Sequence, residues 1–204
     1  MLPIVWMSNI GLLSEWLRWP WIVVYAVVTV VHLSHAIDTD CRQVWHSNHV
    51  VMAVGMGYMF LPTRLKAVSD EVWQITFIII AATIVVWVLH LWATQRTIDF
   101  LWMISLFDVV AMIYMFAFPE AAIAPLTYLL VIYFILETIV WMGGVFDHTR
   151  QWGRLLPVLI HSRLYSRLIF HEPLVGSSSG RERMTLSAMA AGMAYMFIIM
   201  QSGM

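Results

Sequence analysis

The most informative stretch of the chain is MAVGMGYMF at residues 52–60. It returns almost unchanged near the C-terminus as MAAGMAYMF at residues 189–197, and a shorter version, MIYMF, stands at residues 112–116. In the two long copies the methionines are spaced four and then three residues apart, which places them on one side of a helix. Three copies of M-x-Y-M-F predict a unit that the chain repeats three times.

The composition indicates a membrane protein. Of the 204 residues 61% are hydrophobic and only 11% are charged, whereas soluble domains carry about 25% charged residues. Eleven basic and twelve acidic residues give no polyanion-binding signature, so nucleic acid is not a predicted partner. The single cysteine excludes an internal disulfide. The lipid bilayer and other membrane subunits are the predicted partners.

The apolar segments predict an all-α integral membrane bundle of six transmembrane helices built as three helical hairpins. Residues 19–146 are predicted to hold the first five helices, and residues 184–204 the sixth. Residues 1–18 have no signal-peptide pattern and are predicted to form an interfacial helix. Residues 147–183 are predicted to be an arginine-rich loop with a second amphipathic helix and a glycine-serine tether. The predicted spans are 19–36, 45–60, 72–94, 100–118, 126–146 and 184–200.

This division places each M-x-Y-M-F copy on the second helix of a hairpin. His32 and His90, each preceded and followed by an apolar residue, fall near the ends of the first helices of two hairpins. Most basic residues lie in the connections within the hairpins, and the positive-inside rule therefore places these loops in the cytoplasm. We expect a multi-pass plasma-membrane protein with both termini outside.

Histidines form the second strong feature. His32 and His35 end the first predicted span, and His46 and His49 begin the second, so each pair is three residues apart on one helix. Across the short intervening loop the two pairs could converge on one ion. Ionisable groups within spans are candidates for function, and His90, Asp108 and Glu137 therefore join them.

Thioether sulfurs continue the histidine pattern into the membrane. Methionine is a soft ligand that selects copper(I), and imidazole suits copper in either oxidation state. The sequence therefore predicts a protein that binds copper(I) or passes it through a histidine cluster and methionine-lined helices. The predicted metal ligands are His32, His35, His46, His49, Met52, Met56, Met59, His90, Asp108, Met189, Met193 and Met196.

Other interpretations fit the same residues. Methionine fills irregular gaps and small residues let helices approach closely, so the methionine stripe is also typical of a packing seam. The chain would then be a structural accessory subunit of a larger respiratory or oxygenase-type complex. A third reading is a haem b protein with axial ligands such as His49 and His90. Enzyme signatures are lacking, and no catalytic activity of its own is predicted.

The pattern H-x-x-H-x-x-M-x-x-x-M-x-x-M-x-x-P at residues 46–62, followed by M-A-x-x-M-x-x-M from Met189, resembles an uncharacterised actinobacterial family of small multi-pass membrane proteins rich in histidine and methionine. That family is known only as a domain of unknown function. The resemblance implies a helical membrane architecture and a link to metal. Arg183 and Leu186 stand where a repeat of His46 and His49 would fall, which departs from a symmetric two-helix histidine site.

Overall fold

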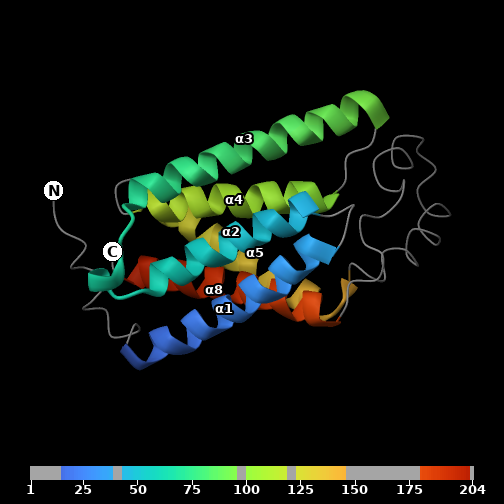
Figure 1. Ribbon diagram of the computed structural model, residues 1–204. Coiled ribbons are helices and arrows are strands. Elements are labelled where there is room, and N and C mark those ends of the chain that lie inside the picture. The colour runs from blue at the N-terminus through green and yellow to red at the C-terminus, as the bar shows by residue number, and fades with distance from the viewer. Residues whose placement is uncertain (1–14, 39–42, 96–99, 119–122, 146–179, 203–204) are drawn as a thin grey trace.

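The computed structural model describes residues 15–38, 43–95, 100–118, 123–145 and 180–202. All regular structure in these ranges is helical (Figure 1), so the predicted all-α fold is confirmed. The helices are α1 (Glu15–Asp38), α2 (Gln43–Phe60), the short 3₁₀ helix η3 (Thr63–Leu65), α3 (Asp70–Gln95), α4 (Phe100–Ala117), α5 (Ala124–Met142) and α8 (Gly180–Ser202).

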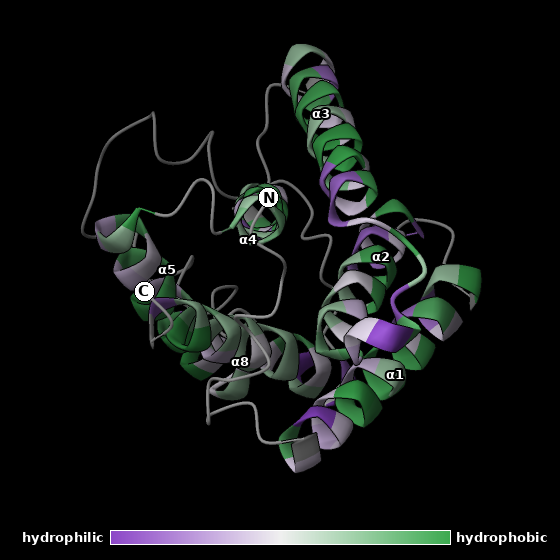
Figure 2. Ribbon diagram, turned by 90° about the vertical axis from the view of Figure 1, so that its left-hand side faces the viewer, coloured by the Kyte–Doolittle hydropathy of each residue, from purple (hydrophilic) through white to green (hydrophobic). Residues whose placement is uncertain are grey.

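Length and composition make this a membrane protein. Within the described ranges, four helices, α1, α3, α5 and α8, are long and apolar enough to cross a bilayer. The fourth predicted span, α4, is a shorter apolar helix. Apolar residues predominate along α3 in particular (Figure 2). The larger count of six spans stays a prediction.

Two helix boundaries differ from those expected. The first helix begins at Glu15, before the predicted start at Trp19, so residues 15–18 continue the first span instead of ending a separate interfacial helix. The last helix begins at Gly180, so the end of the predicted tether is its first turn. The remainder of the predicted interfacial helix and of the arginine-rich loop lies outside the described residues.

The helices divide into an outer and an inner set. The outer helices are α1, α3 and α5, and the inner helices are α2, α4 and α8; α1 packs along α2, α3 along α4, and α5 along α8. In the apolar 18-residue stretch of each helix, only 17% of the residues are buried in α1 and in α3 and 22% in α5, against 67% in α8. Outer helices therefore present apolar side chains to lipid, while inner helices supply the core. Because the connecting segments are not described, the three-hairpin architecture stays a prediction.

Aromatic stacking repeats in all three helix pairs. One ring of each outer helix stacks on the phenylalanine that ends the M-x-Y-M-F copy of its inner helix. The centroids are 5.9 Å apart for Tyr25 and Phe60, 5.7 Å for Phe77 and Phe116, and 5.8 Å for Phe134 and Phe197. Equal spacing at equivalent positions supports three copies of one structural unit.

The tyrosine of each copy joins its own pair to the next one. The three contacts are Tyr58 with Trp73 at 5.4 Å between centroids, Tyr114 with Thr127 at 2.8 Å between oxygens, and Tyr195 with Trp21 at 5.5 Å between centroids. The first pair therefore touches the second, the second the third, and the third the first. The three units therefore form a closed ring, and the inner helix of each unit lies on the inside of this ring.

Glycine at one repeat position permits the closest approaches. A Cβ atom at Gly55 would lie 2.8 Å from Phe77 Cζ, and one at the equivalent Gly192 would lie 1.8 Å from Tyr25 Oη. Both distances are shorter than van der Waals contact. An aromatic ring of the neighbouring unit therefore occupies the space that a side chain would need, as in other small-residue helix contacts.

Candidate functional site

The residues His32, His35, His46 and His49, hereafter the histidine group, lie together where α1 ends and α2 begins. His32, His46 and His49 are buried, with exposed fractions of 0%, 1% and 4%, and His35 is half-buried. Ring centroids are 5.4 Å apart for His32 and His46, 5.1 Å for His32 and His49, and 5.2 Å for His35 and His46. The structure thus brings together the two histidine pairs of the sequence.

His32 is the centre of a hydrogen-bonded chain. Its Nδ1 lies 3.1 Å from His46 Nδ1, and its Nε2 lies 3.2 Å from Thr185 Oγ1 of α8. The Thr185 hydroxyl donates its one proton to the Glu182 carbonyl at 2.8 Å, so it accepts from His32 Nε2–H. His32 Nδ1 then carries a lone pair and accepts from His46 Nδ1–H. This chain of bonds assigns the tautomer of His32 and places a proton on His46 Nδ1.

Helix α8 supplies two polar residues that the sequence analysis missed. Thr185 contacts His32, and Glu182 Oε1 lies 4.0 Å from His46 Nε2 with both side chains buried. In the repeat alignment, Arg183 and Leu186 stand at the positions of His46 and His49. Glu182 and Thr185 are the residues just before them, and an acidic side chain and a hydroxyl one turn apart at the start of an apolar helix would have indicated the site.

His35 and His49 bond to their own helices. His35 Nδ1 donates to the Val31 carbonyl at 2.7 Å and His49 Nδ1 to the Trp45 carbonyl at 2.8 Å. In the part of the chain that the structure describes, no three His, Cys, Asp or Glu side chains are arranged to hold a metal ion. His32 has both ring nitrogens in hydrogen bonds within the protein, to His46 and to Thr185.

Replacing Thr185 by valine should lower the free energy of unfolding by about 1–3 kcal/mol, because the isosteric change leaves buried His32 Nε2–H without its acceptor. Denaturant titration in mixed micelles measures the change. The Thr185→Ser variant keeps the hydroxyl and should remain close to the wild type. A loss of stability in Thr185→Ser but not in Thr185→Val would show that the methyl group, and not the hydrogen bond, is what matters.

His90 does not join the histidine group. Its side chain is exposed on α3, with Trp87 as a ring neighbour 6.0 Å away. The aromatic stacking gives the reason: His32 follows Tyr25 by seven residues, and the residue seven after Phe77 is Ile84, which is buried. The sequence match between His32 and His90 was therefore out of structural register.

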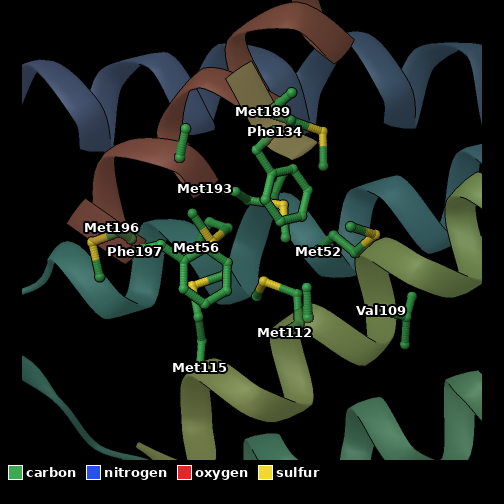
Figure 3. Packing of buried hydrophobic residues seen from close by; sticks show 14 of the residues in the cluster. Met52, Met56, Val109, Met112, Met115, Phe134, Met189, Met193, Met196 and Phe197 are labelled. Atoms are coloured by element: carbon green, nitrogen blue, oxygen red, sulfur yellow. The ribbon is translucent and has the colours of Figure 1, made fainter. Parts of the chain in front are cut away.

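Methionines from all three inner helices fill the centre of the bundle. Figure 3 shows the labelled methionines pointing into one interior that also holds Phe134 and Phe197. The buried methionines are Met52, Met56, Met112, Met115, Met189, Met193, Met196 and Met200, with exposed fractions of 0–4%. Met59 is half-buried at the edge of this core. Met112, Met115 and Met200 were not among the predicted ligands.

Asn48 links the histidine group to this methionine core. It is buried next to His49 in the chain, and its Nδ2 donates to Ser105 Oγ of α4 at 2.6 Å and to Met52 Sδ at 3.7 Å. Its Oδ1 is buried without a hydrogen-bond partner among the described residues. A buried carbonyl oxygen in this state is a ready acceptor or ligand. Asn48 was not among the predicted site residues.

Asp108, a predicted metal ligand, occupies the repeat position of Met52 and Met189, but its carboxyl interacts with side chains of α5. Its carboxyl accepts a hydrogen bond from Tyr133 Oη at 3.2 Å and interacts with the Glu137 carboxyl of α5. Glu137 in turn accepts from Trp141 Nε1 at 3.1 Å. This polar group joins α4 to α5, as polar side chains often do between membrane helices.

The fold and the site together define a helical membrane protein with a polar histidine group at one end of a methionine-rich core. A family model described as a domain of unknown function (DUF5134) matches residues 41–200. Because this match covers most of the chain, the protein belongs to that family, and the resemblance to an uncharacterised family is confirmed. Comparison with curated proteins and with solved structures gave no match.

Proposed function

We propose that the protein binds copper(I) in the membrane, taking it from the histidine group into the methionine core. The observation that carries this proposal is that Asn48, which is adjacent to His49 in the chain, contacts the methionine core. Asn48, His49 and Met52 follow one another on α2, and the Asn48 amide nitrogen lies 3.7 Å from Met52 Sδ. An amide oxygen, an imidazole nitrogen and a thioether sulfur are thus available within little more than one turn of the same helix.

The donor set favours copper(I) over other ions. Thioethers are soft ligands that select copper(I), whereas calcium and magnesium require oxygen ligands, and zinc prefers thiolate, imidazole and carboxylate. His49 Nδ1 donates to the Trp45 carbonyl, so the lone pair of its ring stands on Nε2, the atom that would ligate the ion. Binding at His32 would require its bonds to His46 and Thr185 to rearrange.

The same features bear on the location and the partners of the protein. The apolar outer helices suit a bilayer, and we place the protein in the plasma membrane, where further membrane subunits would pack against α1, α3 or α5. The role is that of a copper carrier or donor without catalysis of its own. Haem b ligation by His49 and His90 is less favoured, because His49 is buried beside Trp45 and His90 is exposed on α3.

Elemental analysis of the purified protein tests the proposal. Loaded with copper(I) under anaerobic, reducing conditions and then desalted, the wild type should retain copper. The double variant His46→Ala, His49→Ala should retain at least about tenfold less, the size of effect that perturbing a metal site produces. His90→Ala, an exposed histidine on α3, is the matched control and should behave as the wild type.

Two outcomes contradict the proposal. A wild-type protein that retains no copper removes it entirely. Retention that is unchanged in the His46→Ala, His49→Ala variant removes the histidine group from the route.

A further inference from the structure

The three inner helices each contribute one methionine from the same repeat position. Met56 of α2, Met112 of α4 and Met193 of α8 are the first methionines of the three M-x-Y-M-F copies. Their exposed fractions are 0%, 0% and 1%. In a closed ring of three units, equivalent positions are expected to face the same axis, which directs these three side chains toward the centre of the bundle.

Contacts around Gly55 support this meeting point. A Cβ atom at Gly55 would lie 3.3 Å from Met112 Cε, so the end of the Met112 side chain touches α2 one residue before Met56. Figure 3 shows Met56, Met112 and Met193 directed from three helices into one part of the core, beside Phe134 and Phe197. Met112 of the middle copy therefore belongs to the same buried core as Met56 and Met193 of the first and third copies.

We propose that Met56, Met112 and Met193 form a three-thioether centre that binds a soft monovalent cation, either copper(I) or silver(I). The inference rests on the proposed copper function and adds the middle repeat, which supplies the third sulfur. Thioethers are uncharged, and the cost of burying an ion rises steeply with its charge. A neutral site of three soft donors therefore selects a singly charged ion over Zn²⁺ or copper(II).

Competition for copper(I) with a chromophoric chelator tests the centre in the purified full-length protein. Met112→Leu preserves side-chain volume and should weaken copper(I) binding at least about tenfold, as loss of a metal-site contact does. Met103→Leu, an exposed methionine on the same helix, is the control and should bind as the wild type. X-ray absorption at the copper edge should show three sulfur neighbours in the wild type and two in Met112→Leu.

The readouts separate this inference from the proposed function. If Met56→Leu and Met193→Leu weaken binding but Met112→Leu does not, the three-sulfur centre is wrong while the copper function stands. If the wild type binds no copper(I) and no silver(I), both fall. If Met112→Leu binds weakly but also loses its thermal transition, the Met112→Ile variant loaded with silver(I) decides. Three sulfur neighbours in the X-ray absorption spectrum of that variant would overturn the centre, and two would support it.

Discussion

Replacing Gly192 by alanine is expected to lower the free energy of unfolding by about 2–3 kcal/mol, a typical cost of overpacking a tight core. The new Cβ would lie 1.8 Å from Tyr25 Oη and 2.8 Å from Tyr25 Cζ. Tyr25 cannot turn aside, because it is 1% exposed and stacked between Trp21 and Phe60. Helices α1 and α8 would therefore separate. Denaturant titration in mixed micelles measures the loss.

Two variants make this result specific. Gly57→Ala places its Cβ at an ordinary 3.4 Å from Tyr25 Cβ and should be neutral or stabilising by about 1 kcal/mol, the helix-propensity gain of alanine over glycine. Tyr25→Phe removes the nearest atom and should recover part of the stability of Gly192→Ala. A Gly192→Ala protein as stable as the wild type would mean that α1 and α8 do not approach as described.

Replacing His32 by alanine is expected to cost about 3 kcal/mol or more, because it combines a cavity with the loss of two buried hydrogen bonds. His46 Nδ1 and the Thr185 hydroxyl would both lose the partner that lies 3.1 Å and 3.2 Å away. These hydrogen bonds join α1, α2 and α8, so the three helices would lose a polar contact that they share. Unfolding in mixed micelles, followed by circular dichroism, is the measurement.

His90→Ala is the matched control for that experiment. Its side chain is exposed on α3, and surface substitutions usually change stability by less than about 0.5 kcal/mol. Similar losses in the two variants would show that the histidine group has no special structural role. A large loss confined to His32→Ala would identify His32 as the residue that ties α8 to the first two helices.

Much of the fold could be predicted from repeated letters. The three M-x-Y-M-F copies placed Met56, Met112 and Met193 at equivalent positions, and each proved to lie on an inner helix. The first helices of the three units were harder to align, because their equivalence lies in ring packing: Tyr25, Phe77 and Phe134 share a role but little surrounding sequence. For this reason the sequence pattern aligned His32 with His90. The equivalence of Tyr25 and Phe77 in the packing instead aligns His32 with Ile84, which is buried.

The candidate site shows the same division. Histidine pairs three residues apart predicted the meeting of His32 with His46, since i and i+3 share a helix face. The partners of these rings come from distant segments: Thr185 is far from His32 in the chain, and Asn48 acquires its role only when Ser105 of α4 approaches. Spacing along one helix carries no information about which other helix will face it.

The sequence by itself determined that the chain is an apolar helical membrane protein with one methionine-bearing unit used three times, because composition and helical period are properties of the local chain. Only the tertiary structure decided that the three units close into a ring and that the middle unit adds Met112 to the core. It also showed that α8 places the hydroxyl of Thr185 and the carboxylate of Glu182 next to the histidines. Those features depend on which faces of separate helices meet, and packing across the bundle settles that.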